Sequence, residues 1–204
     1  RPISTQQTGF SYIAQLRSWL PREIGGILWF GNDDGNMVAY VPIYCSNTER
    51  AECFNTPGAD AVTFSDKNAF WVCNWVSNMV YPRYSQLFPA LKEVRDSLDN
   101  AFLAAQKGVE AKAEALYATD KAAAVKYLND YSIQKSNEMI TRWRQLAIHL
   151  IVKFNDMTVK PEKDGKFLRT STGLGERVKR TGYSDYFKRE LVKQTGDKFA
   201  VPNK

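Results

Sequence analysis

The sequence predicts an α+β protein in which a β-hairpin comes first and a layer of long antiparallel helices follows. Residues 1–45 are rich in β-branched and aromatic runs that Gly and Asn interrupt, which is typical of strands and turns. Residues 66–154 instead repeat apolar side chains at helical spacing. Two or three strands make a poor sheet by themselves, so we expect further strands to come from polypeptide upstream of this sequence.

The hairpin is expected in residues 25–45. GILWF and MVAYVPIY have the composition of its strands, and GNDDGN between them contains Asp-Gly and Asn residues that tolerate positive φ. NDDG could instead open a cation-binding loop, but the acidic ligand that a calcium loop needs further on is missing, so a turn is favoured. Ahead of the hairpin, SYIAQLRSWL (11–20) fits a strand or a helix about equally.

After a polar loop, the stretch FWVCNWVSNMVYPRYSQLFP (70–89) predicts the first helix. Ser65 or Asp66 is its expected cap, and Pro82 should end or kink it. Apolar side chains occupy most of its circumference, so we expect this helix to be buried. Cys73 would then behave as a small hydrophobic residue and not as a reactive thiol. The alternative is that the aromatic side chains form a docking face for a partner.

Two longer helices are expected at residues 88–118 and 120–154, and Asp120 should cap the second of them. A break is expected between Asp130 and Ser136, because Asn, Asp and Ser side chains compete with the helix for hydrogen bonds. Long amphipathic helices joined by short breaks pack as antiparallel pairs. The positions expected to be buried are Leu91, Val94, Leu98, Phe102 and Val109, followed by Val125, Leu128, Ile140, Trp143, Ala147, Leu150 and Ile151.

The last part of the chain, residues 157–204, is polar and contains several Gly residues, so we expect an extended arm. GLGER (173–177) follows no strand and indicates a plain turn in preference to a dinucleotide-binding loop. YSDYFKRELVKQ (183–194) predicts a short terminal helix with Ser184 as its cap. The sequence therefore divides into residues 1–156 and this arm.

The net charge of +6 and the pI of about 9.2 are compatible with nucleic-acid binding. The Lys and Arg residues are nevertheless interleaved with acidic residues, and a solvated surface explains the clusters RVKR (177–180) and YFKRELVK (186–193) better than a phosphate track does. No window approaches the roughly 18 apolar residues of a membrane span. We therefore expect neither a nucleic acid nor a membrane as a partner.

The cysteines and the single histidine do not form a recognisable catalytic or metal-binding set. Cys45 and Cys53 could pair in an oxidising compartment, although two free thiols are favoured, and the spacing of the three cysteines is not that of a metal site. His149 lies in the apolar run LAIHLIV, where a packed helix residue is expected, so a Cys-His or Ser-His-Asp arrangement is disfavoured. We expect no metal and no cofactor.

Three segments together resemble the carboxy-terminal part of the dipeptidase A family: residues 8–48, 59–84 and 128–156. These enzymes are cysteine dipeptidases of the N-terminal-nucleophile hydrolase superfamily. The positions that carry the resemblance, besides the aromatic helix, are Thr8, Ser11, Gln15 and Arg17 in T-x-x-S-x-x-x-Q-x-R, then Leu20, Pro21, Trp29 and Val41 to Tyr44.

The resemblance implies a four-layer αββα fold and a nucleophilic cysteine at the mature amino terminus. The α-amino group of that cysteine would be the base, since its pKa of about 8 suits proton transfer from a thiol near neutral pH. The present sequence starts at Arg1, and Cys45, Cys53 and Cys73 are internal. The nucleophile is therefore expected upstream, residues 1–156 are expected to be part of the peptidase domain, and the chain alone is expected to be inactive.

The partners that the resemblance implies are the upstream portion of the same polypeptide and a short peptide substrate, and a homo-oligomer is left open. Arg1 and Arg17 are candidates for binding a substrate carboxylate, because a guanidinium binds a carboxylate through two hydrogen bonds; a surface ion pair is the favoured alternative for each. Asn74 could point toward a substrate pocket. Related proteins occur both inside cells and exported, and we expect a periplasmic or secreted location slightly ahead of a cytoplasmic one.

Overall fold

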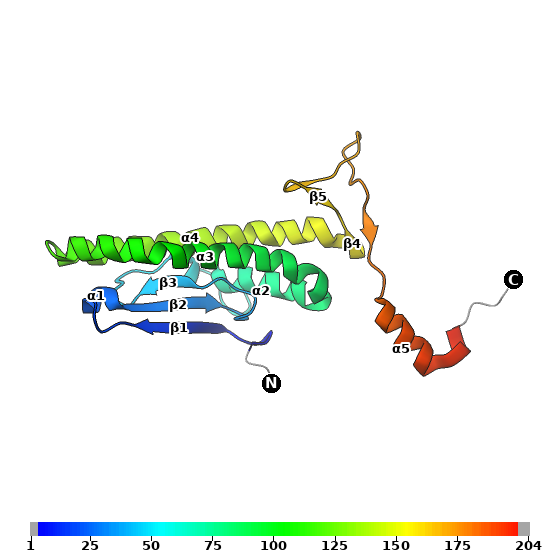
Figure 1. Ribbon diagram of the computed structural model, residues 1–204, viewed down its shortest axis with the longest axis horizontal. Helices are drawn as coiled ribbons and strands as arrows, with labels where there is room; N and C mark the ends of the chain where they lie inside the picture. The colour runs from blue at the N-terminus through cyan, green and yellow to red at the C-terminus, as the bar shows by residue number, and fades with distance from the viewer. Residues whose placement is uncertain (1–3, 200–204) are drawn as a thin grey trace. The chain divides into compact units, whose positions relative to one another are not determined.

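The computed structural model describes residues 4–199 and divides the chain into two compact units, residues 1–150 and residues 151–204. The first unit combines a small antiparallel sheet with long helices, which confirms the predicted α+β class (Figure 1). Its elements are the strands β1 (Phe10–Leu16), β2 (Gly26–Asn32) and β3 (Val41–Tyr44), the short helix α1 (Arg22–Gly25), the 3₁₀ turns η1 (Glu52–Phe54) and η2 (Tyr81–Arg83), and the helices α2 (Ala69–Val80), α3 (Tyr84–Tyr117) and α4, which begins at Lys121.

The sheet has the order β1-β2-β3, and each neighbouring pair is antiparallel. The predicted hairpin is therefore confirmed, and the ambiguous segment before it contains the strand β1. The second strand of the hairpin is shorter than predicted, because β3 begins at Val41 and not at Met37. Asp33 turns the chain out of β2 with a φ of 70°, and Met37 is buried in the connection that follows.

The aromatic helix begins and ends close to the predicted positions. Its cap is Asn68, whose side chain accepts a hydrogen bond from the backbone N–H of Trp71, so the prediction of Ser65 or Asp66 was wrong. Ser65 instead accepts from the backbone N–H two residues ahead of it, and thereby stabilises the turn that leads into the helix. The helix ends before Pro82, which lies in η2.

The predicted long helices are present, and α3 begins four residues earlier than residue 88. Asp120 caps α4 as predicted, since its carboxylate accepts from the backbone N–H of Ala123. Most of the predicted buried stripe is buried, but Val94 and Val125 are only half-buried, and Ile151 is exposed. The fully buried members include Leu91, Leu98, Phe102, Leu128, Trp143, Ala147 and Leu150.

The predicted break in the middle of α4 was wrong, because the helix runs without interruption from Lys121 to Phe154. Its polar side chains bind neighbouring groups without replacing helical hydrogen bonds. Asn129 Oδ1 accepts from the backbone N–H of Glu49 at 2.9 Å, and Ser136 Oγ donates to the Ser132 carbonyl at 2.8 Å. A tertiary contact therefore satisfies Asn129 and a hydrogen bond within the helix satisfies Ser136, so neither side chain disrupts the helix.

The two faces of the sheet have different surroundings. One face contacts the helices, and Ile27, Trp29 and Tyr44 on it are buried. The cross-strand register places a second set of apolar side chains on the opposite face, which we call the outer face. Its members are Phe10, Tyr12, Ala14, Leu16, Leu28, Phe30, Val41 and Ile43.

In the described part of the first unit, the outer face is open along β1, whereas its side chains on β2 and β3 are half-buried or buried. Tyr12 and Leu16 are 58% and 76% exposed, and Phe10 is exposed as well. Phe54 of η1 packs edge-on against Phe30, with 5.5 Å between the ring centroids, and so covers one part of this face. The strand β1 is also an edge of the sheet and contains no proline that would block further pairing.

The second unit contains two short ladders and a terminal helix. Ser184 accepts from the backbone N–H of Phe187, which confirms the predicted cap of the terminal helix. None of the described helices is long and apolar enough to cross a membrane. The elements of this unit, besides the end of α4, are η3 (Asn155–Met157), β4 (Thr158–Val159) paired with β7 (Lys179–Arg180), β5 (Glu162–Lys163) paired with β6 (Lys166–Phe167), α5 (Asp185–Thr195) and η4 (Gly196–Phe199).

Replacing Asn129 by Ala should destabilise the first unit by about 2 kcal/mol, because the backbone N–H groups of Thr48 and Glu49 lose their acceptor. The free energy of unfolding in urea measures this loss. Asn137→Ala is the matched control, since Asn137 is exposed on the same helix, and it should change stability by less than about 0.5 kcal/mol. Equal effects of the two substitutions would contradict the role assigned to Asn129.

Candidate functional site

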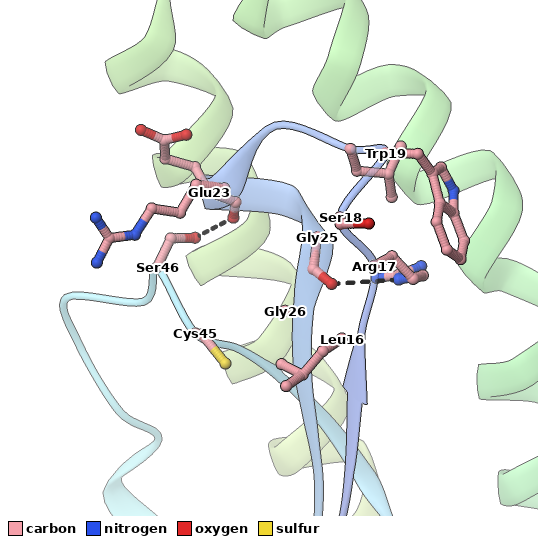
Figure 2. Close-up of a pocket in the computed structure, with 11 residues that line it drawn as sticks. Leu16, Arg17, Ser18, Trp19, Glu23, Gly25, Gly26, Cys45 and Ser46 are labelled. Carbon is pink, nitrogen blue, oxygen red and sulfur yellow. Dashed lines mark hydrogen bonds between the residues drawn. The ribbon is translucent and has the colours of Figure 1, made fainter.

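A hollow of about 770 Å³ lies at one end of the sheet, where β1 ends, β2 begins and β3 ends (Figure 2). It adjoins the end of the outer face, because Leu16 is both the last residue of β1 on that face and part of the hollow. The residues that line it are Leu16, Arg17, Ser18, Trp19, Leu20, Arg22, Glu23, Gly25, Gly26, Cys45 and Ser46.

Two consecutive glycines allow the chain to close tightly around this hollow. A Cβ atom on Gly25 would lie 2.5 Å from the carbonyl oxygen of Arg17, which is closer than real Cβ contacts permit. A Cβ atom on Gly26 would lie 3.0 Å from Cys45 Sγ. Ser46 Oγ donates to the Glu23 carbonyl at 2.7 Å and thereby ties the end of β3 to α1.

Cys45 is the exposed member of the three cysteines and lies in this hollow. Its backbone N–H donates to the Gly26 carbonyl, so Leu16, Gly26 and Cys45 form one row across the three strands. Figure 2 shows Leu16 and Cys45 on either side of Gly26. The hollow therefore presents a thiol, an exposed leucine and the exposed indole of Trp19.

Arg17 borders the hollow, but its guanidinium is held by partners on the helix side of the sheet. Nη1 makes an ion pair with Glu110 Oε1 of α3 at 2.5 Å, and both side chains are nearly buried. Nε and Nη2 donate to the carbonyls of Gly25 and Ile24, each at 3.3 Å. These contacts bind the α1 turn to α3, and the substrate-binding role of Arg17 stays a prediction.

A network of polar side chains extends from this ion pair on the helix side of the sheet. Gln106 Nε2 donates to Glu110 Oε1 at 2.9 Å and to Gln15 Oε1 at 3.2 Å, and Gln15 also accepts from the indole N–H of Trp29. The hydroxyl of Tyr44 lies 3.4 Å from Glu110 Oε1. Burial, and then the Glu110 charge, raise the pKa of Tyr44 well above its usual value.

A second polar cluster lies at the opposite end of β2. Asp33 is completely buried, and its carboxylate accepts from Asn74 Nδ2 at 2.8 Å and from Ser77 Oγ at 2.5 Å. Burial raises the pKa of Asp33, although these hydrogen bonds oppose the shift. The neighbouring Asp34 is also buried and accepts from the hydroxyl of Tyr81. This cluster fixes the orientation of α2 against the sheet.

The structure does not bring the predicted substrate-binding residues together. Arg17 lies at the Gly26 end of β2, whereas Asn74 binds Asp33 beyond its other end. Seven residues of strand span roughly 20 Å, and Figure 1 shows α1 and α2 at opposite ends of the sheet. Arg1 lies outside the described residues.

The other two cysteines have unreactive surroundings. Cys73 is buried, and that burial raises the pKa of its thiol, which confirms the prediction of a small hydrophobic residue. Burial raises the pKa of the Cys53 thiol to about 11. All three cysteines are free thiols in the structure. Among the described residues, no three His, Cys, Asp or Glu side chains lie close enough to hold a metal ion.

The prediction that α2 is buried on almost all sides was wrong. Val72, Cys73, Val76 and Val80 are buried, but the opposite side of the helix is only half-buried. That side forms an aromatic hollow of about 320 Å³, in which Trp71 donates its indole N–H to the carbonyl of Asp60. Its lining residues are Phe64, Trp71, Asn74, Trp75 and Asn78.

The sequence pattern did not reveal the roles of Glu110 and Asp33. The sequence analysis assigned no role to Glu110, and only its distance to Arg17 shows that the two residues form a pair. Asp33 was expected to be a turn residue, which it is. Its complete burial has no signal in the local sequence, and its partners Asn74 and Ser77 are more than 40 positions away on α2.

Comparison with known proteins gives two matches. Residues 1–97, which include the whole sheet and α2, match the sequence model of peptidase family C69. The chain is also 20% identical over 150 residues to a probable dipeptidase B from Streptococcus pyogenes serotype M1. That alignment covers 74% of this chain but only 30% of the streptococcal protein, so the chain spans less than a third of its relative.

Replacing Glu110 by Gln should destabilise the first unit by about 3 kcal/mol, because the nearly buried guanidinium of Arg17 would lose its counter-ion. The matched control is Glu114→Gln, one turn further along α3 on an exposed position, which should change the free energy of unfolding by less than about 0.5 kcal/mol. A Glu110→Gln variant as stable as the Glu114→Gln variant would contradict the importance of the pair.

Because burial raises the pKa of Asp33, the contribution of this residue to stability should change with pH in a direction that can be predicted. Between its unfolded and its folded pKa, the folded protein binds more protons at this group, so the contribution of Asp33 to stability falls as the pH rises through that window. The Asp33→Asn variant has no carboxyl group to titrate at this position, so its stability does not fall in that window for this reason. Its stability relative to the wild type should therefore increase from about pH 4 to about pH 7 in urea titrations.

Asp60→Asn is the control for this titration, because hydrogen bonds from the backbone N–H of Val62 and from Thr63 lower the pKa of Asp60. The contribution of Asp60 is present above its unfolded pKa and is lost as the pH falls, so the trend for this variant should have the opposite sign. A pH-independent difference between Asp33→Asn and the wild type would show that Asp33 does not titrate abnormally.

Proposed function

The chain is related to the dipeptidases of peptidase family C69, and from that relationship we propose that it is the carboxy-terminal portion of a cysteine dipeptidase. The relationship confirms the resemblance predicted from the sequence. The enzyme would hydrolyse short peptides by acyl transfer to a cysteine at the mature amino terminus of a preceding segment. Cys45, Cys53 and Cys73 are internal, so none of them carries the α-amino group that would be the base.

The observation that supports this proposal most strongly is the apolar outer face of the sheet. Soluble proteins rarely leave such a face in water, and two packed sheets are the common way to bury it. We propose that a second sheet from the preceding segment covers the outer face and completes a four-layer αββα arrangement. The matched residues 1–97 contain all three strands that carry this face.

The hollow beside Cys45 is the part of the active site that this chain would contribute. It opens at the end of the outer face, so a cysteine at the start of the covering sheet could lie against it. Arg17, fixed by Glu110, would support the wall of the site, and Ser18 and Trp19 would face the substrate. In this arrangement the thiolate of the terminal cysteine attacks the peptide carbonyl, its α-amino group takes the thiol proton and passes it to the leaving amine, and water then hydrolyses the thioester.

A second candidate function is that of a non-catalytic interaction module. The half-buried aromatic side of α2 favours it, because Trp71 and Trp75 together with Phe64 form an apolar surface that a partner could cover. Under this alternative the sheet and the helices would serve as a scaffold for α2, and no preceding cysteine would be required.

Dipeptide hydrolysis tests the proposal when it is measured for the 204-residue chain and for the chain joined to the polypeptide that precedes it in its gene. We expect activity in the joined protein alone, with a loss of at least 1,000-fold when the terminal cysteine of the mature protein is replaced by Ala. Native mass spectrometry reports whether the variant retains its assembly.

Cys53→Ala in the joined protein is the matched control and should retain at least about a third of the activity, because Cys53 is buried and lies outside the hollow. Hydrolysis by the chain alone, or a loss of activity in Cys53→Ala with the fold intact, would contradict the assignment of the nucleophile. A well-folded joined protein that cleaves no dipeptide would favour the interaction module.

A further inference from the structure

The charge of the chain is concentrated in its second unit. Residues 151–204 contain 13 Lys and Arg against 7 Asp and Glu, whereas residues 1–150 contain 15 of each. The whole net charge of +6 therefore belongs to the smaller unit. Within it, residues 177–198 hold seven basic and three acidic side chains and surround the helix α5.

The helix α5 is amphipathic, and its apolar side is open. Phe187 and Leu191 are four residues apart and so share one side of the helix. Tyr183, just before the Ser184 cap, stacks on Phe187 with 4.6 Å between the ring centroids. Phe187 and Leu191 are 45% and 39% exposed. Among the described elements of this unit, only η4 makes an extensive contact with α5.

Basic side chains occupy the flank and the opposite side of the same helix. Lys188, Arg189 and Lys193 lie there, and Asp185 pairs with Lys188 at 3.2 Å without removing the positive excess of the region. An apolar stripe bordered by Lys and Arg is the pattern of a helix that lies in the interface of a membrane, with its apolar side among the lipid headgroups.

We propose that α5 and its basic flanks bind the surface of an anionic phospholipid membrane. The excess of Lys and Arg complements the negative surface potential of such a membrane, and the apolar stripe supplies the hydrophobic part of the binding. A nucleic-acid duplex would neutralise the same charges through its phosphates but would leave the exposed parts of Phe187 and Leu191 in water. This proposal goes beyond the proposed peptidase function and does not depend on it.

The proposal revises the expectation that a membrane is not a partner. That expectation rested on the lack of a spanning segment, and the described helices contain none. A helix at the membrane surface needs neither that length nor continuous hydrophobicity, because its polar side stays in water. The 11 residues of α5 are sufficient for this geometry.

Vesicle flotation with the 204-residue chain tests the proposal. The probes are vesicles of phosphatidylcholine alone and vesicles that also contain about 30% phosphatidylglycerol. We expect binding to the anionic vesicles that weakens at least tenfold in neutral vesicles or when salt is raised from about 0.05 M to about 0.5 M. Absence of binding to the anionic vesicles at low salt would overturn the proposal.

Two variants separate apolar insertion from simple charge attraction. Phe187→Ser combined with Leu191→Ser should weaken binding to anionic vesicles at least tenfold, whereas Val192→Ser should change it less than twofold. Val192 is the matched control because it is also exposed and lies on the opposite side of α5 from Tyr183 and Phe187. Thermal unfolding of each variant verifies that the fold is retained.

If the double variant binds anionic vesicles as tightly as the wild type, the apolar stripe has no part in binding and the lipid proposal is wrong. Tighter binding of a single-stranded oligonucleotide than of the anionic vesicles would likewise overturn it in favour of a phosphate polymer. Retention of tight binding by the Val192→Ser variant alone, with loss in the double variant, supports it.

Discussion

A sheet has two faces, and the helices of this chain cover only one of them. The covered face buries Ile27, Trp29 and Tyr44 against the helices, while Tyr12 and Leu16 on the outer face remain in water. Burial of apolar surface is the main favourable term in folding, at roughly 25 cal/mol per Å². The outer face is therefore the feature that most strongly supports the proposed further layer, and the candidate site lies where this face ends.

The position of the candidate site depends on how the end of the sheet is fixed. Arg17 links α1 to α3 through Glu110, and the close approach of Gly26 to Cys45 holds β2 and β3 together where the hollow opens. The polar contacts lie on the helix side of the sheet, and the hollow adjoins the end of the outer face. Under the proposed function, these contacts would fix one wall of a site whose reactive group would come from the covering layer.

Local patterns in the sequence were sufficient for the class of fold and for most elements, since hydrophobic periodicity and turn residues act over short distances. They failed where contacts between residues far apart in the sequence determine the local structure. The interruption expected in α4 is absent, and Asn129 and Ser132 there accept from backbone N–H groups 80 and 88 positions earlier. The cap of α2 was missed for a local reason, because Asn68 and not Ser65 or Asp66 accepts from the N–H of Trp71. The same limit applies to the site, because neither the Glu110 partner of Arg17 nor the burial of Asp33 has a signal nearby in sequence. The excess of Lys and Arg in the second unit, by contrast, follows from counting charged residues in the sequence.

Hydrogen–deuterium exchange of β1 tests the central claim, that a preceding segment covers the outer face and its edge strand. The comparison is between the 204-residue chain and the chain joined to the preceding polypeptide, with β3 as an internal reference, since most of it is already buried. The account predicts that amides of Phe10–Leu16 exchange at least tenfold more slowly in the joined protein, while those of Val41–Tyr44 change little. Equal exchange of β1 in both proteins would mean that the outer face stays open, and the proposed four-layer arrangement would be wrong.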